Sequence, residues 1–354
     1  MLRFEQGEGM LIKIDKTGSA TSPLTLGKRV RVTAANNEPR VGDVVAVKAL
    51  TESVTYGNLE LPNGRLAKIN HGDVLLGVLG KRRALKGFVG NVPASVNAGD
   101  QLHLLNMGGV IGECTGHHSS LSDAIAVEVI GTVCDEIELP MNIGDAGLFP
   151  SGTLGRTAPI VTVAGSCMNS GKTVAAIEII RQASNSGLKV AGAKLTGIAC
   201  LRDTLNMEDH GAFITASFLD CGLPSTVDQG ELSSVSKALI NHLNGFEPDL
   251  IVAELGDGII GGYGVDSILK DAEIRDAISS FVFCASDYVG VVGGAAVLRD
   301  LGVSIDVVAG SVTDSQMGED FVRDHLGFEA GNARRAGAKL FGLVEASLKA
   351  EAIK

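Results

Sequence analysis

The sequence lacks what several classes of protein need. It contains no tryptophan, and aromatic residues make up only 4% of its 354 residues, so the stacking platforms of single-strand nucleic-acid binders are missing. The formal charge of -11 also opposes binding to a phosphate backbone. No apolar run reaches the roughly 18 residues of a membrane-spanning helix. We therefore expect neither a nucleic acid nor a membrane as partner.

Cysteine is scarce and is not arranged in pairs. None of the six cysteines forms a C-x-x-C motif, and the first residues lack the apolar stretch of a secretory signal. These features predict reduced, mostly buried thiols and a cytoplasmic location.

The amino-acid composition and the length of the chain indicate a folded protein of two domains. Hydrophobic residues make up 45% of the chain and charged residues 20%, and the 46 glycines follow no collagen-like period. The length fits two domains of ordinary size. A linker-like stretch from Phe149 to Gly155 places the boundary near residue 155.

Residues 1–155 read as a β-rich domain. Short runs rich in Val, Leu and Ile are separated by glycine and asparagine turns, which favours a small barrel-like or sandwich fold. Strands are predicted at Arg29–Ala34, Asp43–Leu50, Asp73–Leu79, Gln101–Leu105 and Ala124–Val133.

Residues 156–354 alternate between apolar runs and segments of helical period, which predicts an α/β domain with a parallel sheet. The predicted strands are Ile160–Ala164, Val190–Lys194, Leu250–Ala253, Phe281–Cys284, Val289–Val292 and Val307–Val308. The predicted helices are Lys172–Ser186, Leu232–Asn244, Ala295–Leu301, Gly318–Leu326 and Ala333–Ala350.

The strongest motif joins the first strand and first helix of this domain. Its nine residues, Gly165 to Thr173, resemble G-x-x-x-x-G-K-[ST], the pattern of a phosphate-binding loop, with five residues instead of four between the two glycines. Backbone N–H groups of such a loop point at a phosphate at the helix N-terminus. The predicted nucleotide-binding residues are Gly165, Ser166, Cys167, Met168, Asn169, Ser170, Gly171, Lys172, Thr173 and Val174. We expect Lys172 to meet the β- and γ-phosphates and Thr173 to ligate Mg²⁺. No N-K-x-D motif is visible, which favours ATP over GTP.

Polar residues also follow the later strands, where open α/β sheets bind their ligands. Their order resembles the dethiobiotin-synthetase-like (SIMIBI) branch of the P-loop NTPases over residues 158–315. The matching segments are Lys194–Gly197, Asp209, Glu254–Gly258 and Gly290–Gly302. The chain is also similar to uncharacterised relatives of molybdopterin-guanine-dinucleotide accessory proteins. Leu195 stands where this branch has proline and Leu255 interrupts its Glu-Gly pair. These departures leave the implied nucleotide binding intact but put the biotin-precursor substrate of the branch in doubt.

The resemblance implies roles for further residues. Thr173, Asp209 and Glu254 would hold Mg²⁺ directly or through water, since hard oxygen ligands suit this ion. Asp203 competes with Asp209 for that role. Lys194, with Lys172, would face the transferring phosphoryl group as a catalytic residue. Members of the branch work as dimers, which implies a homodimer here.

Two other clusters have two possible interpretations. The run Cys114-Thr115-Gly116-His117-His118 could bind a metal, but a polar loop is favoured because zinc needs four ligands at a recognisable spacing. The basic run Lys81-Arg82-Arg83 with Lys86 is either a solvated turn or a site that attracts an anion.

The function predicted from these features is Mg·ATP-dependent activation of a small anionic substrate, in the manner of a ligase or ATPase. The alternative is an NTPase switch that assists assembly of a cofactor or metal centre. A third possibility is a nucleotide-binding protein that has lost catalysis.

Overall fold

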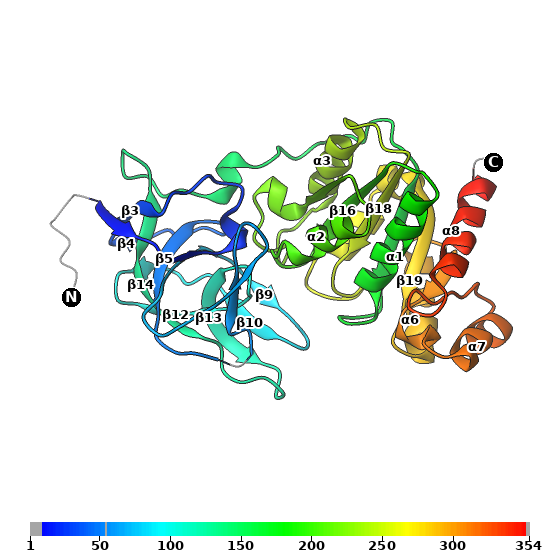
Figure 1. The fold of residues 1–354 in the computed structure, drawn as a ribbon, viewed down its shortest axis with the longest axis horizontal. Helices are drawn as coiled ribbons and strands as arrows, with labels where there is room; N and C mark the ends of the chain where they lie inside the picture. The colour runs from blue at the N-terminus through cyan, green and yellow to red at the C-terminus, as the bar shows by residue number, and fades with distance from the viewer. Residues whose placement is uncertain (1–8, 54, 352–354) are drawn as a thin grey trace. The chain divides into compact units, whose positions relative to one another are not determined.

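The computed structural model describes residues 9–53 and 55–351, which form two compact units (Figure 1). Unit 1 comprises residues 1–148 together with Ile198–Arg202 and Leu219–Val227. Unit 2 comprises 149–197, 203–218 and 228–354. The main division thus falls at Leu148, a few residues before the predicted boundary at 155. Two short segments of the C-terminal half fold with the β-rich half, which the sequence alone did not indicate.

Unit 1 is built on a closed ring of strands. In the ring β14 pairs with β5, β5 with β8, β8 with β13, β13 with β12, and β12 again with β14. The pair of β8 and β13 is parallel and the other pairs are antiparallel. The ring strands are β5 (Val44–Ala49), β8 (Val74–Leu79), β12 (Gln101–Leu104), β13 (Val110–His117) and β14 (Ala126–Cys134). Alternate side chains of this barrel-like ring form a buried aliphatic core, which includes Val47, Leu75 and Val127.

Shorter strands extend or flank the ring. They are β1 (Met10–Lys13), β2 (Lys16–Thr17), β3 (Arg29–Thr33), β4 (Ala35–Asn36), β6 (Asn58–Glu60), β7 (Leu66–Lys68), β9 (Arg82–Arg83), β10 (Phe88–Asn91) and β11 (Val96–Asn97).

Unit 2 contains a six-stranded sheet in the order β17-β16-β18-β15-β19-β20, and all its pairs are parallel. Its strands are β15 (Ile160–Gly165), β16 (Val190–Thr196), β17 (Ile214–Ser217), β18 (Leu250–Leu255), β19 (Ile278–Cys284) and β20 (Val307–Ala309). Parallel strands end at the same edge of a sheet. The loops that follow β15, β16 and β18 are therefore neighbours.

Helices cover both faces of this sheet. On one face α1 (Lys172–Asn185) and α8 (Gly337–Glu351) pack against it, and Ile180 and Leu340 join Val163 in the buried core. On the other face, Ile240 and Ile268 pack near Ile160. The remaining helices are α2 (Arg202–Asp209), α3 (Ser233–Asn244), α4 (Val265–Lys270), α5 (Ala272–Ala277), α6 (Tyr288–Asp300) and α7 (Gln316–Leu326).

The predicted fold class is confirmed: an α/β domain with a parallel sheet follows an all-β, barrel-like domain. One predicted strand, Val289–Val292, is wrong because these residues lie in α6. The Asp287 side chain accepts a hydrogen bond from Gly290 N–H and so caps the start of that helix, which overrides the strand preference of the valines.

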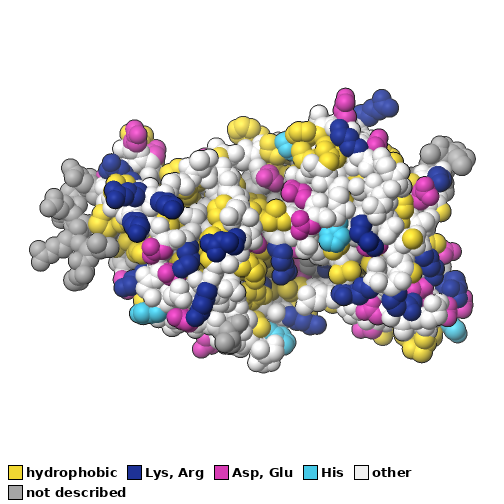
Figure 2. All heavy atoms as spheres, in the orientation of Figure 1, with side chains coloured by type: hydrophobic (Ala, Val, Ile, Leu, Met, Phe, Trp, Pro, Cys, Tyr) yellow, Lys and Arg dark blue, Asp and Glu magenta, His cyan; other side chains and the backbone are white. Residues whose placement is uncertain are grey.

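The surface has mixed charge. On the face in Figure 2, the described Lys and Arg side chains are interspersed with acidic ones and form no single continuous basic surface. Among residues 9–53 and 55–351, no helix is both long enough and apolar enough to span a bilayer.

Candidate nucleotide site

The predicted phosphate loop joins β15 to α1 in unit 2. Gly165 ends β15, Ser166 to Gly171 form the loop, and Lys172 to Val174 open the helix. Asn169 and Gly171 have φ values of 61° and 102°, the left-handed conformation that turns successive N–H groups toward one point. The strand, loop and helix therefore adopt the backbone path that anion binding needs at a helix N-terminus.

Two glycines permit the tight packing of this loop. A Cβ at Gly165 would lie 2.4 Å from Ser170 Oγ, and a Cβ at Gly310 would lie 2.2 Å from Ser170 O. Gly310 also has a φ of 90°. Any larger residue at either position would displace the loop.

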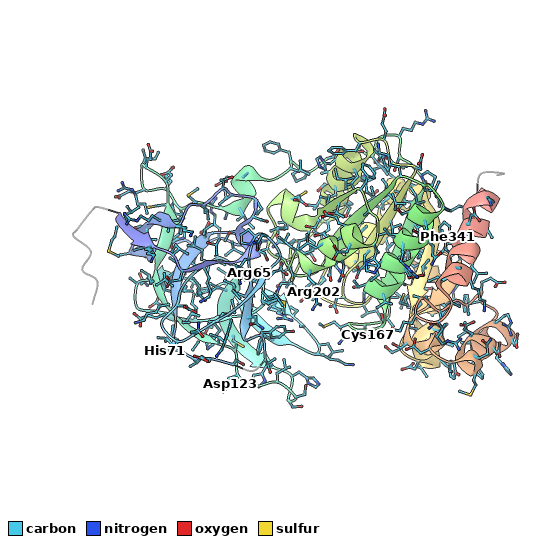
Figure 3. All side chains as sticks on the ribbon, in the orientation of Figure 1. Arg65, His71, Asp123, Cys167, Arg202 and Phe341 are labelled. Carbon is cyan, nitrogen blue, oxygen red and sulfur yellow. The ribbon has the colours of Figure 1, made fainter. Side chains whose placement is uncertain are left out.

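Lys172 points into its own loop. Its side chain is only 6% exposed, and its Nζ donates a hydrogen bond of 2.8 Å to Cys167 O (Figure 3 labels Cys167). Burial lowers the pKa of Lys172, although attraction to Glu254 partly opposes that effect. Among the described residues, Cys167 O is the hydrogen-bond acceptor of this buried amine. A bound anion would give the amine a charged acceptor in direct contact, which favours its burial.

The ends of β16 and β18 bring two more predicted residues together. The register pairs Lys194 with Glu254, and Lys194 Nζ donates a 2.6 Å hydrogen bond to Glu254 Oε1. Thr173 Oγ1 donates to the same oxygen at 3.0 Å. Three of the residues that sequence reasoning singled out, Thr173, Lys194 and Glu254, thus form one hydrogen-bonded group beside the loop.

Lys194 also contacts an acid that sequence reasoning placed second. Its Nζ lies 2.9 Å from Asp203 Oδ2. Burial alone would disfavour the charged amine, but Asp203 and Glu254 outweigh burial and raise the pKa of Lys194. Lys194 is therefore a protonated group held between two carboxylates.

Asp209 ends α2 and is exposed. It stands six residues beyond Asp203, or about 9 Å along the helix axis. Of the two competing acids, Asp203 is the one that contacts Lys194. The metal role of Asp209 stays a prediction.

Glu254 fits a metal ion. The residue is 1% exposed, and its Oε2 has no hydrogen-bond partner among the described residues, while Oε1 accepts from both Thr173 and Lys194. A buried carboxylate oxygen without a partner is costly unless a ligand satisfies it. A hydroxyl and a carboxylate are hard oxygen donors of the kind that Mg²⁺ takes, often with water and phosphate completing its shell.

Asp257 is a site residue that sequence reasoning did not single out. It follows β18 with a φ of 66°, and burial raises its pKa even though Lys172 acts in the opposite direction. A Cβ at the next residue, Gly258, would lie 2.7 Å from Ser166 O, so this turn approaches the phosphate loop closely. The Asp-Gly pair after a buried strand was the signal that could have identified it.

A second missed group lines a crevice beside the start of α1. Asn332 Nδ2 donates a 2.9 Å hydrogen bond to Asp314 Oδ1 there. The crevice is lined by Asn169, Gly171, Val174, Gly310, Ser311, Asp314, Asn332, Ala333 and Arg334. These polar groups come from loops far apart in sequence, which explains why no local motif marked them.

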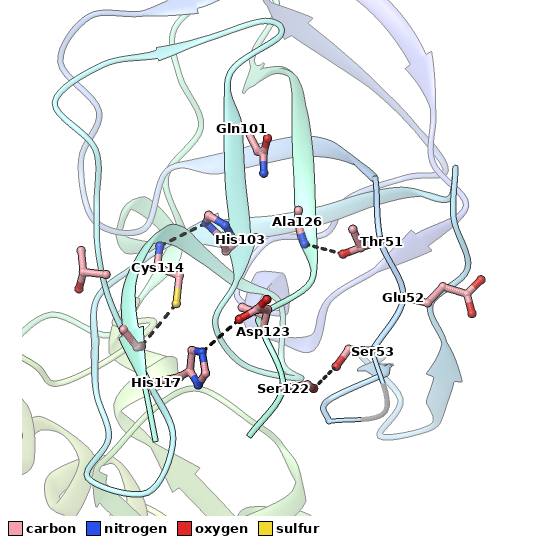
Figure 4. A pocket seen from close by; sticks show the side chains of 13 residues that line it. Thr51, Glu52, Ser53, Gln101, His103, Cys114, His117, Ser122, Asp123 and Ala126 are labelled. Carbon is pink, nitrogen blue, oxygen red and sulfur yellow. Dashed lines mark hydrogen bonds and ion pairs between the residues drawn. The ribbon is translucent and has the colours of Figure 1, made fainter. Parts of the chain in front are cut away.

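Of the Cys114–His118 run, residues Cys114 to His117 line a cavity in unit 1 (Figure 4). The favoured polar-loop interpretation is wrong for Cys114 to His117, because these residues belong to β13. The cavity has a volume of about 770 Å³, and His117 Nε2 lies 3.1 Å from Asp123 Oδ1 at its wall. Burial lowers the pKa of His103, another lining residue. Among the described residues, no three His, Cys, Asp or Glu side chains converge as metal ligands do.

The basic run beginning at Lys81 is not simply a solvated turn. Arg82 is 3% exposed and donates a hydrogen bond to Leu105 O, and its guanidinium lies 5.1 Å from the Tyr56 ring centroid. Arg83 donates to Gly90 O at 2.8 Å. These arginines support the β9–β10 hairpin.

Comparison with known proteins finds likeness only at the level of structure. No protein-family model and no curated protein sequence matches the chain. One similar structure is the signal recognition particle receptor FtsY from Elizabethkingia anophelis, with 11% identity, a TM-score of 0.37, and coverage of 59% of this chain and 75% of that one. Another is the cell division protein ftsY from Thermotoga maritima, with 11% identity, a TM-score of 0.38, and coverage of 60% and 79%.

A third is the signal recognition particle 54 kDa protein from Aeropyrum pernix K1 in complex with GDP, with 16% identity, a TM-score of 0.36, and coverage of 59% of this chain and 54% of that one. The resemblance of the sequence to the dethiobiotin-synthetase-like branch stays a prediction.

Proposed function

We propose that the protein binds a magnesium nucleotide, ATP by preference, at residues 165–174 and transfers its γ-phosphoryl group. The observation that carries this proposal is the direction of Lys172, whose ammonium lies inside the loop and contacts the Cys167 carbonyl. The unpartnered Glu254 oxygen beside Thr173 supports a cation next to the same loop.

Each residue has a distinct part in this proposal. Loop amides and Lys172 bind the phosphates, and Lys194 stabilises negative charge that develops during transfer. Thr173 and Glu254 would hold Mg²⁺, which neutralises phosphate charge when it is bound. Asp203 keeps Lys194 in place through its 2.9 Å contact.

The proposed acceptor is a small anionic substrate with a carboxylate or carbamate. One of its oxygens forms a bond to the γ-phosphorus while the bond from that phosphorus to the bridging oxygen breaks, and ADP leaves with the bond electrons. The substrate and the γ-phosphate are both anions and must approach each other before transfer. Positively charged side chains reduce the repulsion between them. Lys194 and Lys172 provide that charge.

The test is a binding and turnover assay on the full chain. Fluorescent ATP and GTP analogues are titrated with and without Mg²⁺, and ADP release is screened against carboxylate metabolites. Lys172→Ala is expected to weaken binding about 10- to 100-fold, the value of a charge-assisted hydrogen bond to phosphate. Lys270→Ala, which removes an exposed lysine of α4, is the matched control.

Binding that is unaffected by Lys172→Ala would refute the proposed site. Tighter binding of GTP than of ATP would refute the base preference and leave the phosphate site standing.

An NTPase switch is the second candidate. It is favoured by the loop 198–202, which connects β16 to α2 yet belongs to unit 1. A switch would hydrolyse nucleotide slowly until a protein partner is added, whereas the proposed enzyme responds to a small substrate.

We further propose a homodimer. Exposed apolar side chains in unit 2 support it: Ile260 is 73% exposed, Val289 81% and Val292 54%. Ile260 and Val289 lie within two residues of Gly258 and Gly290, where a Cβ would approach Ser166 within 2.7 Å and 3.5 Å respectively. Light scattering after size-exclusion chromatography should give twice the 36.5 kDa chain mass, and a monomer at all concentrations would contradict the proposal.

A further inference from the structure

The loop between β16 and α2 connects two residues of the candidate site. Lys194 precedes it, in β16, and Asp203 follows it, in the first turn of α2. The residues between them that start with Ile198 and end with Arg202 fold as part of unit 1, and Figure 3 labels Arg202. The segment is bonded through the chain to β16 on one side and to α2 on the other.

Glu60, the last residue of β6, holds the segment at the helix start. Its side chain is 1% exposed. Its carboxyl oxygens accept hydrogen bonds from Leu201 N–H at 2.6 Å and Arg202 N–H at 3.2 Å, and a further one from Cys200 Sγ. The first N–H groups of a helix have no partner within the helix, so this carboxyl supplies acceptors that α2 needs.

Other contacts in unit 1 hold the segment just before the helix. Asn106 Nδ2 donates a 2.7 Å hydrogen bond to Ala199 O, and Ala199 N–H donates to Pro224 O at 2.9 Å. A Cβ at Gly108 would lie 2.2 Å from Ala199 O, so the backbones approach closely there. The segment has little room to shift, and Glu60 fixes its last residues.

We propose that Glu60 is a positioning residue for Lys194: by capping α2 it fixes Asp203 where Asp203 can hold the Lys194 amine. The importance of Lys194 for phosphoryl transfer rests on the proposed function, but its positioning by Glu60 can be measured without nucleotide. Loss of the cap weakens the hold on the first turn of α2, which carries Asp203, while the contact of Lys194 with Glu254 remains.

The experiment measures the reactivity of the Lys194 amine. The full chain without nucleotide is treated with a limiting amine-acetylating reagent, and mass spectrometry gives the labelling rate of Lys194 relative to exposed Lys270. Glu60→Gln keeps the shape of the side chain, and Glu60→Ala removes the acceptors. We expect Lys194 to react about 3- to 30-fold faster in these variants, the range that loss of a helix cap produces.

The matched control is Asp43→Asn. Asp43 is another acid of unit 1 that is 1% exposed, and it accepts hydrogen bonds from Asn36 and Asn142. This control is expected to leave the relative rate of Lys194 within about twofold, because sites without shared partners act independently.

A double-mutant cycle with Asp203→Asn separates positioning from general loosening. If Glu60 acts through Asp203, Glu60→Gln changes the Lys194 rate much less in the Asp203→Asn background. An unchanged Lys194 rate in both Glu60 variants, or an equal increase in both backgrounds, would overturn the inference. Failure of the wild type to bind nucleotide would refute the proposed function separately, since the labelling result does not depend on it.

Discussion

The two units bury charged side chains in different ways. In unit 1, buried Arg82 donates to Leu105 O and to the Tyr56 hydroxyl, and buried Glu60 accepts from the amides of Leu201 and Arg202, so each charge bonds to uncharged groups in these contacts. In unit 2, buried Lys194 and Glu254 contact each other. In these examples, the buried charges of unit 1 bond to uncharged groups, whereas Lys194 and Glu254 of unit 2 form an ion pair beside the phosphate loop.

The strand arrangement explains this contrast. The ring of unit 1 is mostly antiparallel, so its strand ends are distributed to both rims. The sheet of unit 2 is parallel throughout, and the carboxyl ends of β15, β16 and β18 meet at one edge. Groups that are isolated in sequence, such as Thr173, Lys194 and Glu254, become neighbours there.

The largest expected effect in this comparison comes from Glu254→Gln in unit 2. We expect the Mg²⁺ concentration needed for nucleotide binding to rise about 10- to 100-fold, because the amide is a poorer ligand than the carboxylate. Affinity for nucleotide without Mg²⁺ should change by less than about threefold. Titration of Mg²⁺ at fixed nucleotide measures both values.

Glu319→Gln is the control for that prediction. Glu319 is also 1% exposed in unit 2, and it pairs with Arg335 and Lys339 instead of with Lys194 and Thr173. The Glu319→Gln variant should have a lower free energy of unfolding but need the same Mg²⁺ concentration for nucleotide binding as the wild type. An equal rise of the Mg²⁺ requirement in both variants would show that the loss of any buried charge in unit 2 has this effect.

A smaller effect is expected from Gly165→Ala. The added Cβ would lie 2.4 Å from Ser170 Oγ and 2.8 Å from Cys284 O, so the free energy of unfolding should fall by about 1–3 kcal/mol, with weaker nucleotide binding. Gly152→Ala, where nothing lies within 4 Å, should leave both unchanged. Urea titration and nucleotide titration check the pair. If Gly165→Ala binds nucleotide as tightly as the wild type, the loop tolerates displacement and the prediction is wrong.

The smallest effect is expected in unit 1, from Asp73→Asn. Burial opposes ionisation of Asp73, but hydrogen bonds from Lys16 and from Asn70 N–H outweigh it and lower the pKa of Asp73 below 3.8. A lowered folded-state pKa means that its stabilising contribution is complete above about pH 3.8 and is lost as the pH falls through the folded value.

Asp73→Asn should therefore cost about 1 kcal/mol near neutral pH and reduce the loss of stability in acid. Urea midpoints measured at several pH values test it. If the stability of Asp73→Asn falls with decreasing pH as steeply as that of the wild type, Asp73 does not contribute to the loss of stability in acid.

Local sequence signals were enough to predict the loop and the helix it enters. The predicted helix Lys172–Ser186 matches α1, which ends at Asn185. By contrast, β13 was missed because Val110–His117 mixes glycine with polar residues, and its pairing with β8, β10 and β12 supplies the order that its composition lacks.

The choice between Asp203 and Asp209 shows the same limit within the site. Both acids lie on one helix, and only the path of the loop before it decides which acid reaches Lys194. On that path, Leu201 N–H donates a hydrogen bond to Glu60, more than a hundred residues earlier in the chain. No local pattern encodes such a contact.

Hydrogen–deuterium exchange of the full chain with and without Mg·ADP tests the central claim most directly. If the main-chain amides between β15 and α1 bind the phosphates, exchange should slow at residues 166–173 in the wild type, and the same slowing in Lys172→Ala should need about 10- to 100-fold more Mg·ADP. Saturating nucleotide that leaves these amides unprotected in the wild type, or that protects only unit 1, would contradict the account.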